Sequence, residues 1–172
     1  MTFLQVRDAF VNRLGAALGR SVILHDQTMV ESEDYPIIYY QPLIPWMPRS
    51  GANRGYTTTA GSLAEKREEL TEATISLSVV SYSRELPDGG YIFGEDEALE
   101  WAERAMSYLI FRGREELQAD GIAVVDVTNV QNRTALLVDD VARQYGFDVR
   151  LRYRRTDTRP GAEVANGRMI QD

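Results

Sequence analysis

The residues best suited to chemistry in this chain are arginines in the stretch QYGFDVRLRYRR, residues 144–155. Side chains alternate between the two faces of a β-strand, so Arg150, Arg152 and Arg154 would share one face. Their planar guanidinium groups suit carboxylates and phosphates equally well. The row could therefore bind nucleic acid, or it could bind an acidic protein surface.

Few other residues suit catalysis. The chain has no cysteine and one histidine, His25, so a structural zinc site and a serine triad both lack their usual groups. The single lysine, Lys66, lies in the charged run EKREE, which predicts a solvated cluster. Asp139 and Asp140 are adjacent and would point apart on a strand or a helix. We expect no enzyme activity, no metal site and no cofactor.

The charge is unevenly distributed along the chain. The formal net charge is −7, which argues against a general DNA-binding protein, because contact with phosphates needs a cationic surface. Residues 143–159 nevertheless contain six arginines and only two aspartates. A subunit divided in this way is suited to pairing its basic strand with the acidic side of a second copy. The candidate subunit-interface residues are Arg150, Arg152, Arg154, Asp139 and Asp140.

The hydrophobic pattern predicts the elements that would position these groups. Apolar residues three or four positions apart predict helices over 2–18 and 94–112. Alternating or β-branched runs predict strands over 21–24, 35–41, 70–83, 122–130 and 143–155. This order predicts an α+β fold, with a mixed, largely antiparallel β-sheet and two α-helices packed on one face.

The length fits a single domain, which we place at residues 1–156. Prolines and glycines between 42 and 61 predict a long loop inserted in that domain. Its apolar residues Trp46, Met47 and Tyr56 either fold back on the core or form a partner-binding loop. The polar residues 157–172 predict a flexible C-terminal tail.

Three stretches of sequence resemble the phage neck or tail terminator proteins. They are GIAVVDVTNVQNRTALLVDDVARQYGFDVRLRY, LQVRDAFVNRLGAALG and DYPIIYYQ, and the similarity spans roughly residues 2 to 154. In that family a strand with a hydrophobic-Asp-Val run is followed by a polar crossover and a final strand of the Tyr-Gly-Phe-Asp-Val type. The resemblance implies a structural virion protein of a tailed bacteriophage. Such proteins form rings, typically hexameric, that cap the tail tube and join the tail to the head connector.

The resemblance also implies partners and a location. The partners would be copies of the chain itself, the tail tube protein, the head–tail connector or stopper protein, and double-stranded DNA that passes without sequence-specific binding. The location would be the virion neck, after synthesis in the host cytoplasm, with no membrane contact and no cofactor. Arginines facing a channel would retard DNA, so the arginine row is expected at a subunit interface. The alternative is a small nucleic-acid-binding protein that uses the C-terminal arginine strand.

Overall fold

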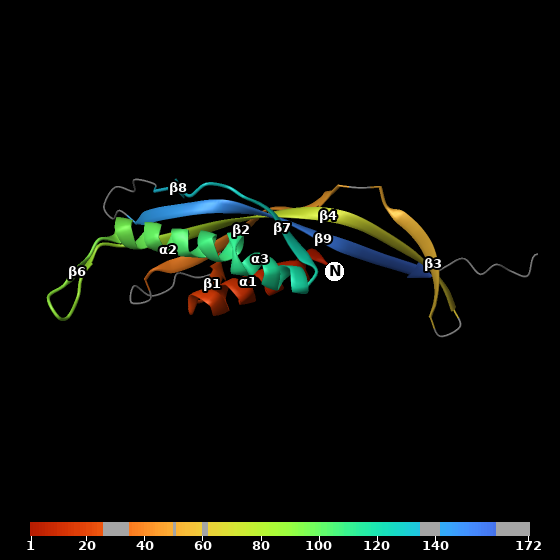
Figure 1. Cartoon of the computed structure of the whole chain (residues 1–172), viewed down its shortest axis with the longest axis horizontal. Helices are drawn as coiled ribbons and strands as arrows, with labels where there is room; N and C mark the ends of the chain where they lie inside the picture. Colours follow the sequence, from red (N-terminus) through yellow and green to blue (C-terminus); the bar gives the residue numbers. More distant parts are fainter. Residues whose placement is uncertain (26–34, 50, 60–61, 135–141, 161–172) are drawn as a thin grey trace, which may run out of the picture.

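The structure is a computed structural model, and it describes residues 1–25, 35–49, 51–59, 62–134 and 142–160. Its fold is α+β, as predicted, with three helices packed against one face of a mixed sheet in the described residues (Figure 1). The helices are α1 (Phe3–Leu18), α2 (Gly94–Ile110) and α3 (Arg112–Ala119). The main sheet contains β1 (Val22–Leu24), β2 (Ile37–Pro48), β3 (Asn53–Thr59), β4 (Ser62–Ser81), β7 (Ile122–Val127), β8 (Gln131–Asn132) and β9 (Arg143–Pro160). A separate hairpin is formed by β5 (Arg84–Glu85) and β6 (Tyr91–Ile92).

The sheet is built around its two longest strands, β4 and β9. The strand order is β1-β2-β4-β9-β7, with β3 also paired to β4 and β8 also paired to β9. The β1–β2 pair is parallel, and the other pairs of this sheet are antiparallel. β4 and β9 pair over the whole range from Ala64↔Pro160 to Ser81↔Arg143, so contacts distant in sequence dominate the fold.

The core lies between this sheet and the helices. On β4 and β9 every second side chain faces the helices, and these side chains are almost completely buried: Ala73, Ile75, Leu77, Val79, Phe147, Val149, Leu151 and Tyr153. The helices add the buried side chains Val6, Phe10, Leu14, Ala98, Ala102, Ala105, Leu109 and Leu117. α1 begins with a capping box between Thr2 and Gln5 and ends at Gly19, which is in the left-handed conformation. The helical spacing in α1 and the alternation in β4 and β9 thus correspond to the faces that are buried.

The prediction of two helices was wrong, because α2 stops at Ile110 and α3 follows it. Phe111 has φ −115° and ψ −97°, outside the helical region, so the chain changes direction there. In the short helix α3 that follows, the buried residues are Gly113 and Leu117. A short helix with one buried apolar side chain gives little periodic signal in the sequence.

The predicted loop at 42–61 was also wrong, because β2 continues to Pro48 and β3 occupies 53–59. β1 pairs with β2 only over residues 38–40, so among the described strands the rest of β2 has a neighbour on one side, β4. Proline is tolerated on such an edge and at irregularities of register. The register shifts twice here, between Pro42 and Ile44 and between Ile44 and Met47.

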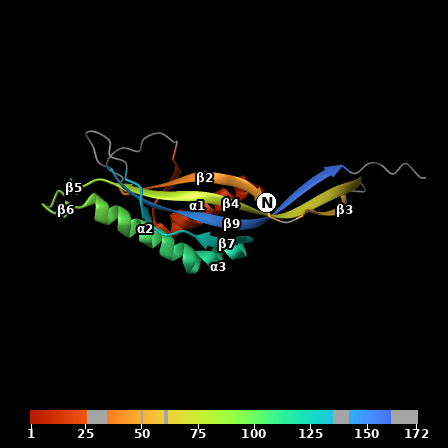
Figure 2. The same cartoon turned by 90° about the horizontal axis from the view of Figure 1, so that it is seen from above.

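Strands β4 and β9 both extend beyond the predicted limits. The EKREE run lies within β4 and is not a solvated cluster ahead of it, and β9 continues to Pro160. The start of the predicted tail, 157–160, is therefore strand, and residues 161–172 lie outside the described part of the chain. We call the resulting three-stranded ribbon the arm: residues 53–59, 62–70 and 154–160. Figures 1 and 2 show that it extends past the ends of the helices, at the opposite end of the molecule from the β5–β6 hairpin.

Candidate functional site

The arginine row lies on the face of the sheet that points away from the helices. On β9, Phe147, Val149, Leu151 and Tyr153 are at most 1% exposed and face the core. Arg152 and Arg154 on the opposite face are exposed, and Arg150 is half-buried. The alternation predicted for residues 147–154 is thus confirmed. We refer to this side of the sheet as the open face.

A buried carboxylate lies among these arginines. Glu72 on β4 is directly opposite Arg152 in the β4–β9 register, and its side chain is 2% exposed. Nη2 and Nε of Arg152 donate to Glu72 Oε1 at 2.7 and 2.9 Å, and Nε of Arg49 donates to Oε2 at 2.8 Å. Nε of Arg150 is 3.9 Å from Oε2, too far for a hydrogen bond. One carboxylate is therefore shared by three guanidinium groups.

The pKa of Glu72 reflects this arrangement. Burial alone raises the pKa of this carboxyl, but the hydrogen bonds and charges of Arg49 and Arg152 outweigh it and hold the pKa below the usual glutamate value. Glu72 is therefore a carboxylate at neutral pH, and the cluster retains a surplus of positive charge. Asp126 offsets part of this surplus, at 3.4 Å from Nη2 of Arg150.

A second polar group occupies the same face, closer to the C-terminal end of β4. Nη2 of Arg133 is 2.8 Å from Asp148 Oδ1, and Ser76 Oγ donates to the same oxygen at 2.8 Å. Arg133 also donates to Ser76. Beside this group is a hollow of about 180 Å³, lined by His25, Tyr39, Tyr40, Gln41, Ser76, Ser78, Arg133 and Gln144. The open face is thus polar along most of its described length.

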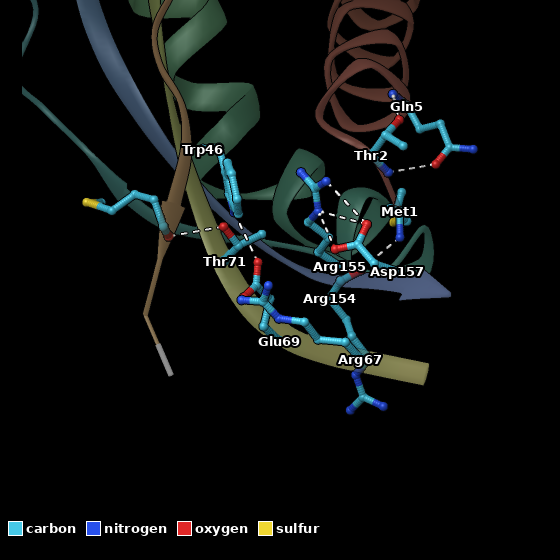
Figure 3. Close-up of polar contacts among 11 residues, drawn as sticks. Met1, Thr2, Gln5, Trp46, Arg67, Glu69, Thr71, Arg154, Arg155 and Asp157 are labelled. Carbon is cyan, nitrogen blue, oxygen red and sulfur yellow. Dashed lines mark hydrogen bonds and ion pairs between the residues drawn. The ribbon is translucent and has the colours of Figure 1, made fainter. Parts of the chain in front are cut away.

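The other face of β4 holds a second buried glutamate, at the base of the arm. Glu69 is 3% exposed and accepts hydrogen bonds from Trp46 Nε1 at 3.1 Å and from Arg67 Nη2 at 2.7 Å (Figure 3). The guanidinium carbon of Arg155 lies 4.5 Å from the centre of the Trp46 ring, and its Nε is 3.1 Å from Asp157 Oδ2. These contacts attach the end of β2 to β4 and β9 where the arm begins.

The predicted partner-binding residues have different surroundings. Trp46 packs under Arg155, yet 47% of it remains exposed. Met47 is opposite Glu72 in the β2–β4 register, and its carbonyl oxygen accepts from Thr71 Oγ1 at 3.1 Å. Tyr56 pairs with Glu65 in the arm, and its side chain is not among those described. Trp46 and Met47 are therefore neighbours at the base of the arm rather than members of a loop.

The structure brings together only part of the predicted interface set. Arg150 and Arg152 meet at Glu72, whereas Arg154 is on the arm, 4.0 Å from Glu68 Oε2. Asp139 and Asp140 lie outside the described residues. Sequence reasoning missed Glu72 and Glu69. A glutamate at a polar position of an alternating strand could have drawn attention to Glu72. That pattern does not, however, identify its partner Arg152, which is 80 positions away.

The outer surface of α2 and α3 carries the opposite charge. The exposed acidic side chains of α2 and α3 are Glu95, Asp96, Glu100, Glu103 and Glu115. Only three basic residues, Arg104, Arg112 and Arg114, are found on these two helices. We refer to this side as the acidic helix face. It contrasts with the arginine-bearing open face on the other side of the sheet.

Within the residues that the structure describes, no group of three or more His, Cys, Asp or Glu side chains could hold a metal ion. No helix in that same part of the chain is long and apolar enough to cross a membrane.

These features define a small α+β protein with charged groups on both sides of its sheet. The family model described as phage neck terminator protein matches residues 5–171, and the chain belongs to this family. No curated protein matches the chain. Family membership confirms the resemblance found in the sequence and implies a structural role in tail completion and a location in the virion. The family is not enzymatic, as expected from the residue types.

Proposed function

We propose that this protein is one subunit of a hexameric ring that caps the phage tail tube and joins the tail to the head connector. The observation that carries the proposal is the contrast between the arginine-bearing open face and the acidic helix face. Cyclic rings are built from heterologous contacts, in which one surface of a subunit meets a different surface of the next. Two faces of opposite charge on opposite sides of one subunit suit such a contact.

In the proposed ring, Arg150, Arg152 and Arg154 of one copy approach the acidic helix face of its neighbour. The surplus of guanidinium groups around Glu72 supports this, because a further carboxylate would complete their pairing. Asp139 and Asp140 remain proposed contributors to the acidic partner surface. This contact places the arginines between subunits, away from DNA passing through the channel.

We further propose that the tail tube protein or the connector contacts the region of Trp46, Met47 and Tyr56. The half-exposed ring of Trp46 supports this, because large aromatic side chains are common at the centres of protein interfaces. The alternative function, nucleic-acid binding through the arginine strand, needs guanidinium groups that are free for phosphates. Arg152 is already committed to Glu72 through two hydrogen bonds, which makes that alternative weaker.

The test reverses charge on each face in turn. Glu100→Arg with Glu103→Arg changes two exposed side chains of α2, and Arg154→Glu changes an arginine that is 69% exposed, so each variant should fold. We expect both variants to leave tail tubes uncapped and variable in length by electron microscopy. Glu85→Arg, on the separate hairpin, is the control and should cap normally.

The outcomes distinguish the parts of this proposal. A wild-type protein that is absent from the tube end would contradict the ring function itself. Normal capping by both charge-reversed variants would contradict the proposed interface. Binding of the isolated protein to duplex DNA that weakens steeply with salt would favour the nucleic-acid alternative.

A further inference from the structure

The arm has an unpaired strand edge on each side in the described part of the chain. β3 pairs with β4 and, among the described strands, with no other. On the other side, β7 accompanies β9 only as far as the pair Ile122↔Tyr153, so β4 is the one described strand that pairs with residues 154–160. At the start of this edge, the Met1 ammonium donates to the Arg154 carbonyl oxygen at 2.9 Å. Such edges expose rows of N–H and C=O groups that readily pair with another strand.

The arm is also poor in apolar side chains. Most of its residues are charged or threonine: Arg54, Thr57, Thr58, Thr59, Glu65, Lys66, Arg67, Glu68, Glu69, Arg154, Arg155, Thr156, Asp157, Thr158 and Arg159. The helices end before the arm does, as Figures 1 and 2 show. A ribbon of strands without a hydrophobic face or a covering helix has little stability of its own. Pairing with a further strand would therefore stabilise the arm.

We propose that the arm joins neighbouring copies of this protein, with the β3 edge of one copy pairing with the β9 edge, residues 154–160, of the next. β3 and β9 are both antiparallel to β4, so they run in the same direction within the arm. Copies related by rotation about a ring axis would therefore meet with these two strands parallel. The β3 edge of each copy would pair with one neighbour and its β9 edge with the other neighbour. A closed ring would therefore leave no arm edge unpaired.

The charges along the two edges favour this head-to-tail pairing. Arg54, Arg67 and Asp157 occupy one row across the arm. If the row continues into the next copy, Arg54 of that copy meets Asp157, and opposite charges directly across a sheet are stabilising. If two β9 edges instead paired antiparallel about Asp157, Arg155 would face Arg159 of the other copy. That arrangement would oppose two cations, which disfavours a two-fold dimer.

This inference rests on the proposed ring, and disulfide trapping can test it separately because the chain has no cysteine. Asn53 and Thr156 lie in the same row on opposite sides of β4, and both are exposed. Two strand spacings separate them within one chain, roughly 9 to 10 Å, which is beyond the reach of a disulfide. A bond between Asn53→Cys and Thr156→Cys must therefore join two copies.

We expect oxidised tails that carry both cysteines to give a ladder of covalent multimers without reductant, extending beyond dimers. A second pair, Asn53→Cys with Thr158→Cys, covers a register displaced by two residues. Asn53→Cys with Ser107→Cys, where Ser107 is an exposed residue of α2, is the matched control and should give no ladder. Each single variant should likewise remain uncross-linked.

A ring at the tube end that gives no ladder with either arm pair would overturn this inference and leave the proposed function intact. Dimers from Thr156→Cys alone would show β9 meeting β9 and would also overturn it. Absence of any ring at the tube end would instead contradict the proposed function.

Discussion

The carboxylate of Glu72 lies 2.7 Å from Nη2 of Arg152, although 80 positions separate the two residues in the chain. The pair crosses the junction of the two longest strands, and Arg49 binds the same carboxylate from the end of β2. One buried side chain thus connects three strands on the open face. Its position explains why a charged residue is stable in the middle of β4.

Replacing Glu72 should destabilise the protein. In Glu72→Ala the guanidinium groups of Arg49 and Arg152 would face each other without their shared acceptor. Because both arginines are nearly half exposed, water compensates in part, and we expect a loss of about 1–3 kcal/mol in the free energy of unfolding. Urea unfolding measures this loss. Glu68→Ala, a more exposed glutamate of the same strand and face, is the control and should unfold close to the wild type.

Glu97 should make stability depend on acid pH. Burial raises the pKa of Glu97, but hydrogen bonds from Arg84 and Ser81 outweigh this and hold the pKa below its usual range. A carboxyl whose pKa is lower in the folded state stabilises the protein above its unfolded pKa, about 4.3, and this contribution is lost as pH falls through the folded pKa. The midpoint temperature of thermal unfolding should therefore fall less steeply between about pH 6 and 2.5 for Glu97→Gln than for the wild type. If the unfolding temperatures of the wild type and Glu97→Gln fell in parallel with pH, this role of Glu97 would be contradicted.

Gly146 should be intolerant of a side chain. It lies in the Tyr-Gly-Phe-Asp-Val segment of β9, and a Cβ at this position would overlap the carbonyl oxygen of Leu77 on β4. Because the obstacle is backbone, the two central strands would have to separate. We expect Gly146→Ala to lower the free energy of unfolding by about 1–3 kcal/mol in urea titrations. Gly55→Ala in β3, where a Cβ has open space, is the control and should not be destabilised.

The sequence predicted the parts of this fold in which apolar side chains repeat with a fixed period. The helix α1 and the alternation of residues 147–154 both have this property, and the structure contains both. The arm has no apolar repeat, and its polar residues are in strands only because β3, β4 and β9 pair with one another. Its existence depends on contacts between distant segments, which no local pattern reveals.

The candidate site was predictable to the same extent. Alternation placed Arg150 and Arg152 on one face, but their partner depends on the β4–β9 register. Prolines in β2 made its outer half resemble a loop, since the sequence does not indicate that this half pairs, among the described strands, on one side only. Trp46 was accordingly assigned to a loop, although it is anchored to two strands.

Trp46 should contribute to stability through two separable contacts. Trp46→Phe removes the indole N–H that donates to Glu69 and keeps an aromatic ring under Arg155, so we expect a loss of about 1 kcal/mol. Trp46→Leu removes the ring as well, and loss of the cation–π contact should add about 0.5–1 kcal/mol. Urea unfolding of the two variants and the wild type measures both steps. Equal losses in the two variants would show that the stacking of Arg155 on Trp46 contributes nothing, whereas a Phe variant as stable as the wild type would show the same for the bond to Glu69.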